Sequence, residues 1–145
     1  MREYVAVVLV KLNGEILIQH RDKNTFYNPL TWCAVGGEKT DPTAGDEEEA
    51  VRELYEETGI KIDPDDLEEI GQEKSYLVPE DGIPERRVFF RALYDGKQEI
   101  KVKEGLDIRF ISPEILETLL ISPGHEKFLR KAAGFFHRGS KERRG

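Results

Sequence analysis

The sequence has very few of the residues and segments that mark secreted or membrane proteins. Only one cysteine, Cys33, occurs among 145 residues, so no disulfide can form within the chain and a reducing, cytoplasmic compartment is expected. No apolar run approaches the roughly 20 residues that a membrane-spanning helix needs. The opening segment, MREYVAVVLV, has an acid too early for a secretory signal. We therefore expect no membrane association.

The chain also lacks an excess of positive charge. It has 22 lysines and arginines against 29 aspartates and glutamates, a net charge of −7, which argues against a general nucleic-acid binder. The basic residues 138–145 are expected to form a flexible, solvated tail. The length predicts one domain, residues 1–137. Two copies of this domain could form a homodimer.

The order of predicted elements indicates an α+β fold, because strands predominate and do not alternate regularly with helices. Asn13-Gly14 is a strong hairpin signal after a continuous apolar run, and Asp95-Gly96 marks a later turn. We predict strands at 4–10, 16–18, 32–35, 67–78, 87–94 and 108–111, and helices at 46–58, 113–120 and 124–136.

The predicted helix at 46–58 carries glutamates where a stable helix would not favour them. Glu49, Glu53, Glu56 and Glu57 recur at spacings of three and four residues, so they share one face and repel each other. Gly59 reads as the residue just past the helix end, which puts Glu56 and Glu57 beside the negative end of the helix dipole. We expect a divalent metal ion to offset these penalties.

The remaining faces of this helix look ordinary. Asp46 is predicted as the N-cap, and Glu49 three residues later completes a capping-box pattern. Arg52 precedes Glu56 by four residues and can hold its carboxylate. An apolar stripe for packing on a core is expected from Ala50, Val51, Leu54 and Tyr55.

The stretch RELYEETGI, residues 52–60, resembles the second half of the Nudix box, whose core reads R-E-U-x-E-E-x-G-U with U aliphatic. The preceding GGEKTDPTAGDEEEAV is similar to the first half, a Gly-Gly loop leading into the helix. The resemblance implies a Nudix-like α/β/α sandwich with a mixed, partly curled sheet between helices. It also implies hydrolysis of a nucleoside diphosphate linked to another group. The box core is matched by Arg52, Glu53, Leu54, Glu56, Glu57, Gly59 and Ile60.

One position departs from the box. The pattern has an outer glutamate where this chain has Ala44, or Thr43 when counted from Gly37, so the loop is one residue longer. Glu47 and Glu48 are the candidates to replace it. The departure favours a second reading, a non-catalytic Nudix domain that binds a nucleotide as a sensor. A solvated acidic surface helix is the third reading, since most charge runs are solvated.

Carboxylates without neighbouring histidine or cysteine ligands select hard cations, so Mg²⁺ is expected, with Mn²⁺ as a substitute. Glu53 and Glu57 are the predicted main ligands and Glu56 a third. Gly36 and Gly37 let the backbone approach a metal or phosphate without a side chain in the way. No ligand spacing relates the three histidines, His20, His125 and His137.

The catalytic base and the substrate are less defined by the residues. Arg52 is expected to orient a carboxylate, and the base is either a box glutamate or Glu104, since the resemblance includes glutamates from a later loop. The substrate is a small nucleotide: a nucleoside triphosphate, ADP-ribose, a nucleotide sugar or a dinucleoside polyphosphate. Core packing is the alternative role for Phe26 and Trp32. The predicted substrate-binding residues are Arg21, Phe26, Trp32, Gly36, Gly37 and Tyr76.

Overall fold

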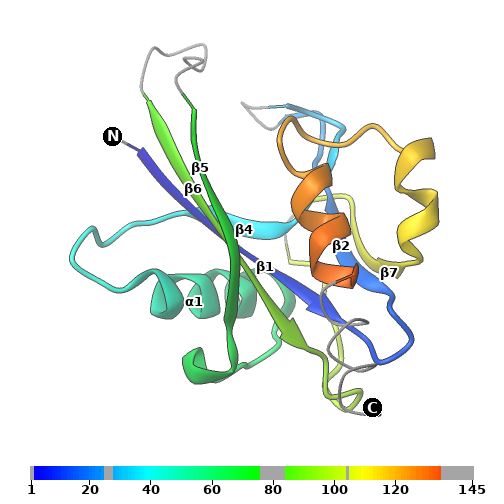
Figure 1. Cartoon of the computed structure of the whole chain (residues 1–145), viewed down its shortest axis with the longest axis horizontal. Helices are drawn as coiled ribbons and strands as arrows, with labels where there is room; N and C mark the ends of the chain where they lie inside the picture. Colours follow the sequence, from blue (N-terminus) through cyan, green and yellow to red (C-terminus); the bar gives the residue numbers. More distant parts are fainter. Residues whose placement is uncertain (1, 25–27, 76–83, 104, 135–145) are drawn as a thin grey trace.

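The computed structural model describes residues 2–24, 28–75, 84–103 and 105–134. One seven-stranded sheet has helices on both faces, so the predicted α+β sandwich is confirmed (Figure 1). The strands are β1 (Arg2–Val10), β2 (Ile16–His20), β3 (Trp32–Cys33), β4 (Val35–Glu38), β5 (Glu68–Ser75), β6 (Glu85–Leu93) and β7 (Asp107–Ile111). The helices are α1 (Asp46–Thr58), the 3₁₀ helices η1 (Pro64–Asp66) and η2 (Pro113–Thr118), and a helix at 126–134.

The sheet is mixed and not strongly curled (Figure 1). Its main order is β3-β2-β1-β6-β5, with β4 also paired to β1 and β7 to β2. β1 runs parallel to β6 and antiparallel to β2 and β4, which makes it the centre of the sheet. This arrangement places the Gly-Gly segment of β4 directly beside the central strand.

The continuous apolar run of β1 is explained by burial on both sides of the sheet. Residues 5–10 are fully buried. Val5, Val7 and Leu9 pack with Leu54 of α1 in one core cluster. Ala6, Val8 and Val10 pack with Leu116 of η2 and with the helix at 126–134 in the other. A strand covered on both faces needs apolar residues at every position, because no side chain faces water.

Helix α1 has the predicted bounds, but its predicted cap is wrong. Gly45 is the N-cap, and no side chain caps the helix. The carboxylate of Asp46 instead accepts hydrogen bonds from Lys39 Nζ at 3.2 Å and from Arg86 Nη2 at 2.6 Å. Two cations therefore draw Asp46 away from the helix amides, so the predicted capping box with Glu49 does not form.

Other boundaries differ from the predictions for local reasons. The strand predicted at 32–35 is divided into β3 and β4, since Ala34 N–H donates to His125 Nδ1 at 3.1 Å. The helix predicted from residue 113 is the shorter 3₁₀ helix η2, and Ser112 bonds Glu114 rather than capping it. The predicted ends at 76–78 and 135–136 lie outside the described residues. Among the described helices, none is long and apolar enough to cross a membrane.

Candidate functional site

Arg52 lies at the centre of the acidic face of α1. Its Nη1 donates to Glu56 Oε1 at 2.8 Å, which confirms the predicted pairing. Its Nη2 also donates to Glu49 Oε2 at 2.6 Å and to Glu53 Oε1 at 3.0 Å. One guanidinium thus contacts three carboxylates. Part of the positive charge that we expected to offset the repulsion among the glutamates therefore comes from the helix itself.

The four glutamates of this face differ in their exposure to water. Glu49 and Glu57 are buried, with 4% and 6% of their surface exposed, while the side chain of Glu56 is 55% exposed. The hydrogen bond from Arg52 lowers the pKa of Glu49 and outweighs the opposing effect of burial. Glu49 is therefore held as a buried carboxylate at neutral pH, and Glu56 marks the water-facing side of the cluster.

Gly37 allows the closest approach of the β-sheet to this face. A Cβ atom at Gly37 would lie 2.4 Å from Glu53 Oε2, so any side chain there would displace that carboxylate. Gly36 has a different reason, since its Cβ would meet Val5 O at 2.1 Å across the strand pair. Gly36 is thus required by sheet packing, and its predicted contact with substrate stays a prediction.

The C-terminal end of α1 is closed by a distant segment. Gly59 has a φ of 78° and donates its N–H to Tyr55 O, as predicted for the residue after the helix. Lys101 N–H donates to Thr58 O at 2.9 Å, and Lys103 N–H donates to Glu57 O at 3.2 Å. Residue 104 itself lies outside the described residues, but its neighbour Lys103 contacts the backbone of Glu57. The loop that carries the candidate base thus reaches the acidic helix.

Tyr55 does not join the predicted apolar stripe. Ala50 and Leu54 are buried, but Tyr55 is 42% exposed because the next residue along a helix is rotated by about 100°. The Lys61 and Lys103 Nζ atoms lie 5.4 Å and 5.2 Å from the centre of the Tyr55 ring. Two lysines from outside the helix therefore bring positive charge to its negative end.

Arg21 lies beside a buried thiol near the acidic face. Burial raises the pKa of Cys33 to about 11. The charge of Arg21 and a hydrogen bond from Arg21 act to lower this pKa, and the charge of Glu57 acts to raise it. Cys33 is thus a free, buried thiol. His125, which accepts the N–H of the next residue, Ala34, is also buried. Burial lowers the pKa of His125 to about 3, so its imidazole is neutral.

Two side chains lie against the ring of the partly buried Trp32. It stacks on His20 with a ring separation of 4.3 Å, and the Arg109 guanidinium lies 5.8 Å from the ring centre. Trp32 also packs against the core cluster that contains the helix at 126–134. These contacts favour the core-packing role. Its contact with substrate stays a prediction, and Phe26, Tyr76 and Glu104 lie outside the described residues.

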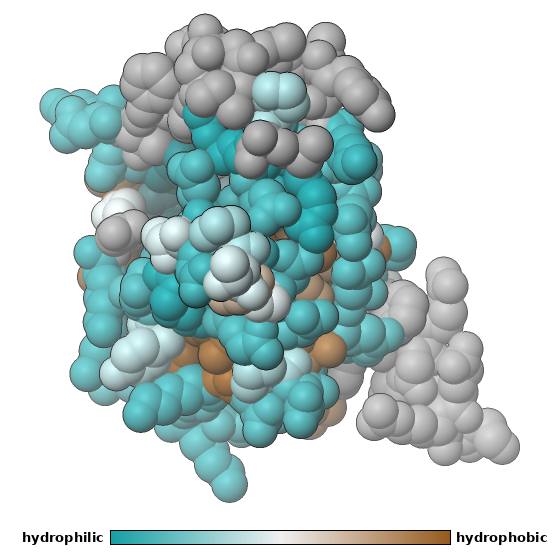
Figure 2. All heavy atoms as spheres, turned by 90° about the vertical axis from the view of Figure 1, so that its left-hand side faces the viewer, coloured by the Kyte–Doolittle hydropathy of each residue, from teal (hydrophilic) through white to brown (hydrophobic). Residues whose placement is uncertain are grey.

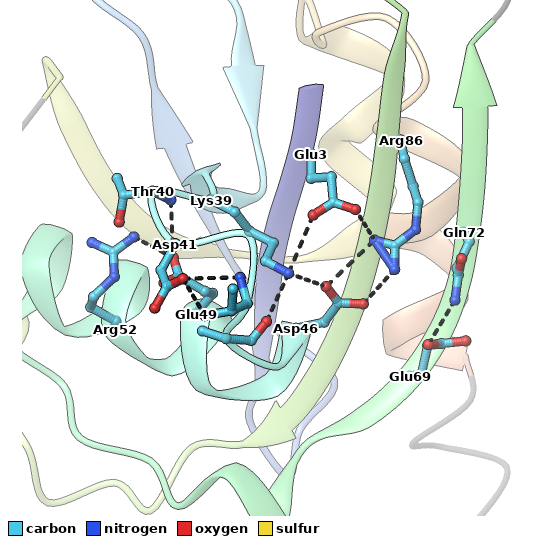
Figure 3. A network of polar contacts seen from close by, with 12 residues as sticks. Glu3, Lys39, Thr40, Asp41, Asp46, Glu49, Arg52, Glu69, Gln72 and Arg86 are labelled. Atoms are coloured by element: carbon cyan, nitrogen blue, oxygen red, sulfur yellow. Dashed lines mark hydrogen bonds and ion pairs between the residues drawn. The ribbon is translucent and has the colours of Figure 1, made fainter. Parts of the chain in front are cut away.

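A second network holds the loop that leads into α1 (Figure 3). Lys39 Nζ bonds Asp46 at 3.2 Å and Glu3 at 3.3 Å, and it donates to Ala44 O at 2.9 Å. Burial works to lower the pKa of Lys39, but the hydrogen bonds with Asp46 and Glu3 raise it overall.

The side of the molecule that faces left in Figure 1 is mostly hydrophilic (Figure 2).

The donor set of α1 fits a hard cation in its chemistry. Glu53 and Glu57 supply carboxylate oxygens, and the missing side chain of Gly37 leaves room beside Glu53. Within the part of the chain that the structure describes, no three acidic, histidine or cysteine side chains are gathered as a metal site. Arg52 holds three of the carboxylates, so an ion would compete with Arg52.

That Glu47 or Glu48 replaces the missing outer glutamate stays a prediction. Glu47 and Glu48 both lie exposed in the first turn of α1. Ala44 is held through its backbone, because its carbonyl accepts from Lys39 and its N–H donates to Asp41 O at 3.2 Å. The extra residue of the loop is accommodated by a turn in which Asp41 Oδ1 accepts from Thr43 N–H at 2.9 Å.

Comparison with known proteins gives one family. The family model described as NUDIX domain matches residues 1–132. The MutT protein of Methanosarcina mazei is 22% identical with a TM-score of 0.71, covering 97% of this chain and 95% of its own. An Ap4A hydrolase of C. elegans is 20% identical with a TM-score of 0.72, covering 94% and 98%.

A domain solved together with ADP ribose has the same fold. The NUDIX domain of Shewanella oneidensis NrtR, solved with ADP ribose, is 18% identical with a TM-score of 0.72, covering 90% of this chain and 84% of its own. At such identities the likeness shows the fold alone. A comparison with curated proteins found no match.

Proposed function

The chain belongs to the Nudix domain family, and on this premise we propose that it is a metal-dependent pyrophosphohydrolase. Its substrate is a nucleoside diphosphate linked to another group, cleaved at a phosphoanhydride. The observation that carries the proposal is the acidic face of α1, where Arg52 contacts three carboxylates at 2.6–3.0 Å beside a side-chain-free Gly37. A face of this kind is costly to a helix unless it binds a cation.

Glu53 and Glu57 are the proposed main ligands of Mg²⁺, with Glu56 and the Gly37 backbone beside them. When bound, the ion would polarise a phosphoryl oxygen and neutralise charge that develops on it. Arg52 keeps the carboxylates oriented through its forked hydrogen bonds. The exposure of Glu56 supports this assignment, because a substrate phosphate must reach the ion from water.

Hydrolysis adds water across the anhydride. The water oxygen bonds to phosphorus, the bridging P–O bond breaks, and the leaving phosphate keeps the electron pair. The proton of the attacking water passes to a base. Two candidates remain, a box glutamate and Glu104. The hydrogen bond from Lys103 N–H to Glu57 O supports Glu104, because it brings the adjacent loop to the acidic helix.

Arg21 is the proposed contact for a substrate phosphate. Its charge and that of Glu57 both act on Cys33, which supports a position near the acidic face. Phe26, Trp32 and Tyr76 are retained as candidates for contact with the nucleoside. The single buried cysteine supports a reducing, cytoplasmic setting.

The second candidate is a non-catalytic nucleotide-binding domain. It is favoured by Ala44, which stands where the box has a glutamate, and by the likeness to the NrtR domain solved with ADP ribose. The full set of box carboxylates on α1 argues against it, because a binding domain has no need for four repelling glutamates.

The test is a hydrolysis screen over nucleoside triphosphates, ADP-ribose, nucleotide sugars and dinucleoside polyphosphates, with Mg²⁺ and with EDTA. We expect Mg²⁺-dependent release of a phosphate or pyrophosphate product from at least one class. Binding of a nucleotide without turnover of any class would favour the sensor instead.

A further inference from the structure

We propose that Lys39 is a positioning residue for the acidic site. It fixes the loop at 39–45 against the start of α1. This loop contains Ala44, which stands where the box has its outer glutamate. The inference rests on the proposed function, because the site that Lys39 positions is the proposed metal and phosphate site. Lys39 itself is not proposed to touch substrate.

The surroundings of Lys39 show that its ammonium group is a fixed part of the structure. Its side chain is only 6% exposed. Each of its three N–H bonds has an acceptor: Asp46 at 3.2 Å, Glu3 at 3.3 Å and the Ala44 carbonyl at 2.9 Å. An ammonium group with three acceptors contributes more than a surface lysine in a single ion pair, because removing it takes one of two counter-charges from two partly buried carboxylates.

The contact with Ala44 links Lys39 to the anomaly of the box. Ala44 is the position at which the pattern has its outer glutamate, and its side chain can make no polar contact. Lys39 instead holds the Ala44 carbonyl from the other end of the same loop. The loop is thus closed between its two ends by one ammonium group.

This loop and the end of β4 that leads into it both contact the acidic face of α1. Gly37 approaches Glu53 so closely that a Cβ would lie 2.4 Å from Oε2. Thr40 N–H points at Glu49 Oε2 at 3.4 Å, and Glu49 in turn accepts from Arg52 (Figure 3). A shift of this loop would therefore remove the Thr40 contact from Glu49 and pull on the end of β4, next to Gly37 and Glu53. Groups that orient ligands in this way typically change metal affinity by 10–100-fold when removed.

Arg86 provides a matched control within the same network. It bonds Asp46 at 2.6 Å and Glu3 at 3.6 Å, so it shares both acidic partners of Lys39. It lies on β6 and bonds those two acids rather than the loop carbonyl. Loss of Arg86 therefore removes a positive charge from the network while the tie between Lys39 and Ala44 stays in place.

The experiment compares Lys39→Met with Arg86→Met. Mg²⁺ affinity is measured by calorimetry, and amide hydrogen exchange over residues 40–45 is measured without metal. We expect Lys39→Met to weaken Mg²⁺ binding by about 10-fold or more and to speed loop exchange. Arg86→Met should stay within about 2-fold of wild type in both. Lys39→Arg, which keeps the charge, should recover most of the affinity.

Equal changes in the two variants would show a general effect of charge and overturn the proposal, as would unchanged affinity and exchange in Lys39→Met. If Lys39→Met does not fold, Lys39→Gln replaces it with the same criteria. Failure of the proposed function has a different signature, since it appears in wild-type protein as the absence of Mg²⁺-dependent turnover. The exchange measurement tests the loop even in that case.

Discussion

Removal of Arg52 tests whether the acidic face of α1 is held by an internal cation. In Arg52→Met the helix loses one guanidinium that contacts Glu49 at 2.6 Å, Glu56 at 2.8 Å and Glu53 at 3.0 Å. The substitution keeps a long apolar side chain, so the loss is mainly electrostatic. Without metal, the four glutamates should then repel each other without the guanidinium that contacts three of them.

The expected cost follows from the burial of the partners. The contact with Glu56 is exposed and should contribute about 0.3–0.5 kcal/mol. The hydrogen bond to buried Glu49 should contribute about 1.5–3 kcal/mol, because that carboxylate would lose a charged donor. We therefore expect Arg52→Met to lower the free energy of unfolding by about 2–4 kcal/mol at pH 7 in EDTA.

Urea unfolding of both proteins, in EDTA and in Mg²⁺, provides the measurement. Saturating Mg²⁺ should stabilise the variant more than wild type, because the ion no longer competes with Arg52 for the same oxygens. Arg130→Met is the control, since Arg130 makes one exposed helical pair with Glu126 at 3.0 Å and should cost less than about 0.5 kcal/mol. An Arg52 variant as stable in EDTA as the Arg130 variant would refute the reasoning.

Two further predictions concern protons. The folded pKa of His125, about 3, lies below its unfolded value, so the unfolded state binds more protons and stability should fall from about pH 6.5 downward by up to about 1.4 kcal/mol per pH unit. His125→Leu should flatten this slope between pH 6.5 and 5 in urea titrations. An unchanged slope would show that groups other than His125 cause the loss of stability. If Glu104 is the base, Glu104→Gln should depress turnover and leave Mg²⁺ affinity nearly intact. Wild-type turnover in that variant would return the role to the box glutamates.

The parts of the fold that sequence reasoning predicted depend on short-range pattern. The α1 bounds follow from local spacing between Asp46 and Gly59, and the Arg52–Glu56 pair follows from helical geometry. The uninterrupted apolar run of β1 predicted a strand, which the structure buries on both sides of the sheet. In each case the residues that decide the outcome are neighbours in the chain.

The parts of the fold that sequence reasoning missed depend on contacts between distant segments. Asp46 looked like an N-cap because Arg86, forty positions away, is invisible to a local pattern. The closure of the α1 C-terminus by Lys101 and Lys103 uses backbone N–H groups, which carry no residue signature. Lys39 could have been noticed as a lone cation inside an acidic loop, but its acceptor is a carbonyl.

The most direct test of the central claim is the turnover of Glu57→Gln against Glu117→Gln in the same Mg²⁺-dependent assay. Both replace one glutamate by glutamine, but Glu57 belongs to the buried side of the acidic face and Glu117 is exposed in η2. We predict that Glu57→Gln lowers turnover by about 10²-fold or more while circular dichroism shows an intact fold, and that Glu117→Gln stays within about 2-fold of wild type. A folded Glu57→Gln protein with wild-type turnover would contradict the account.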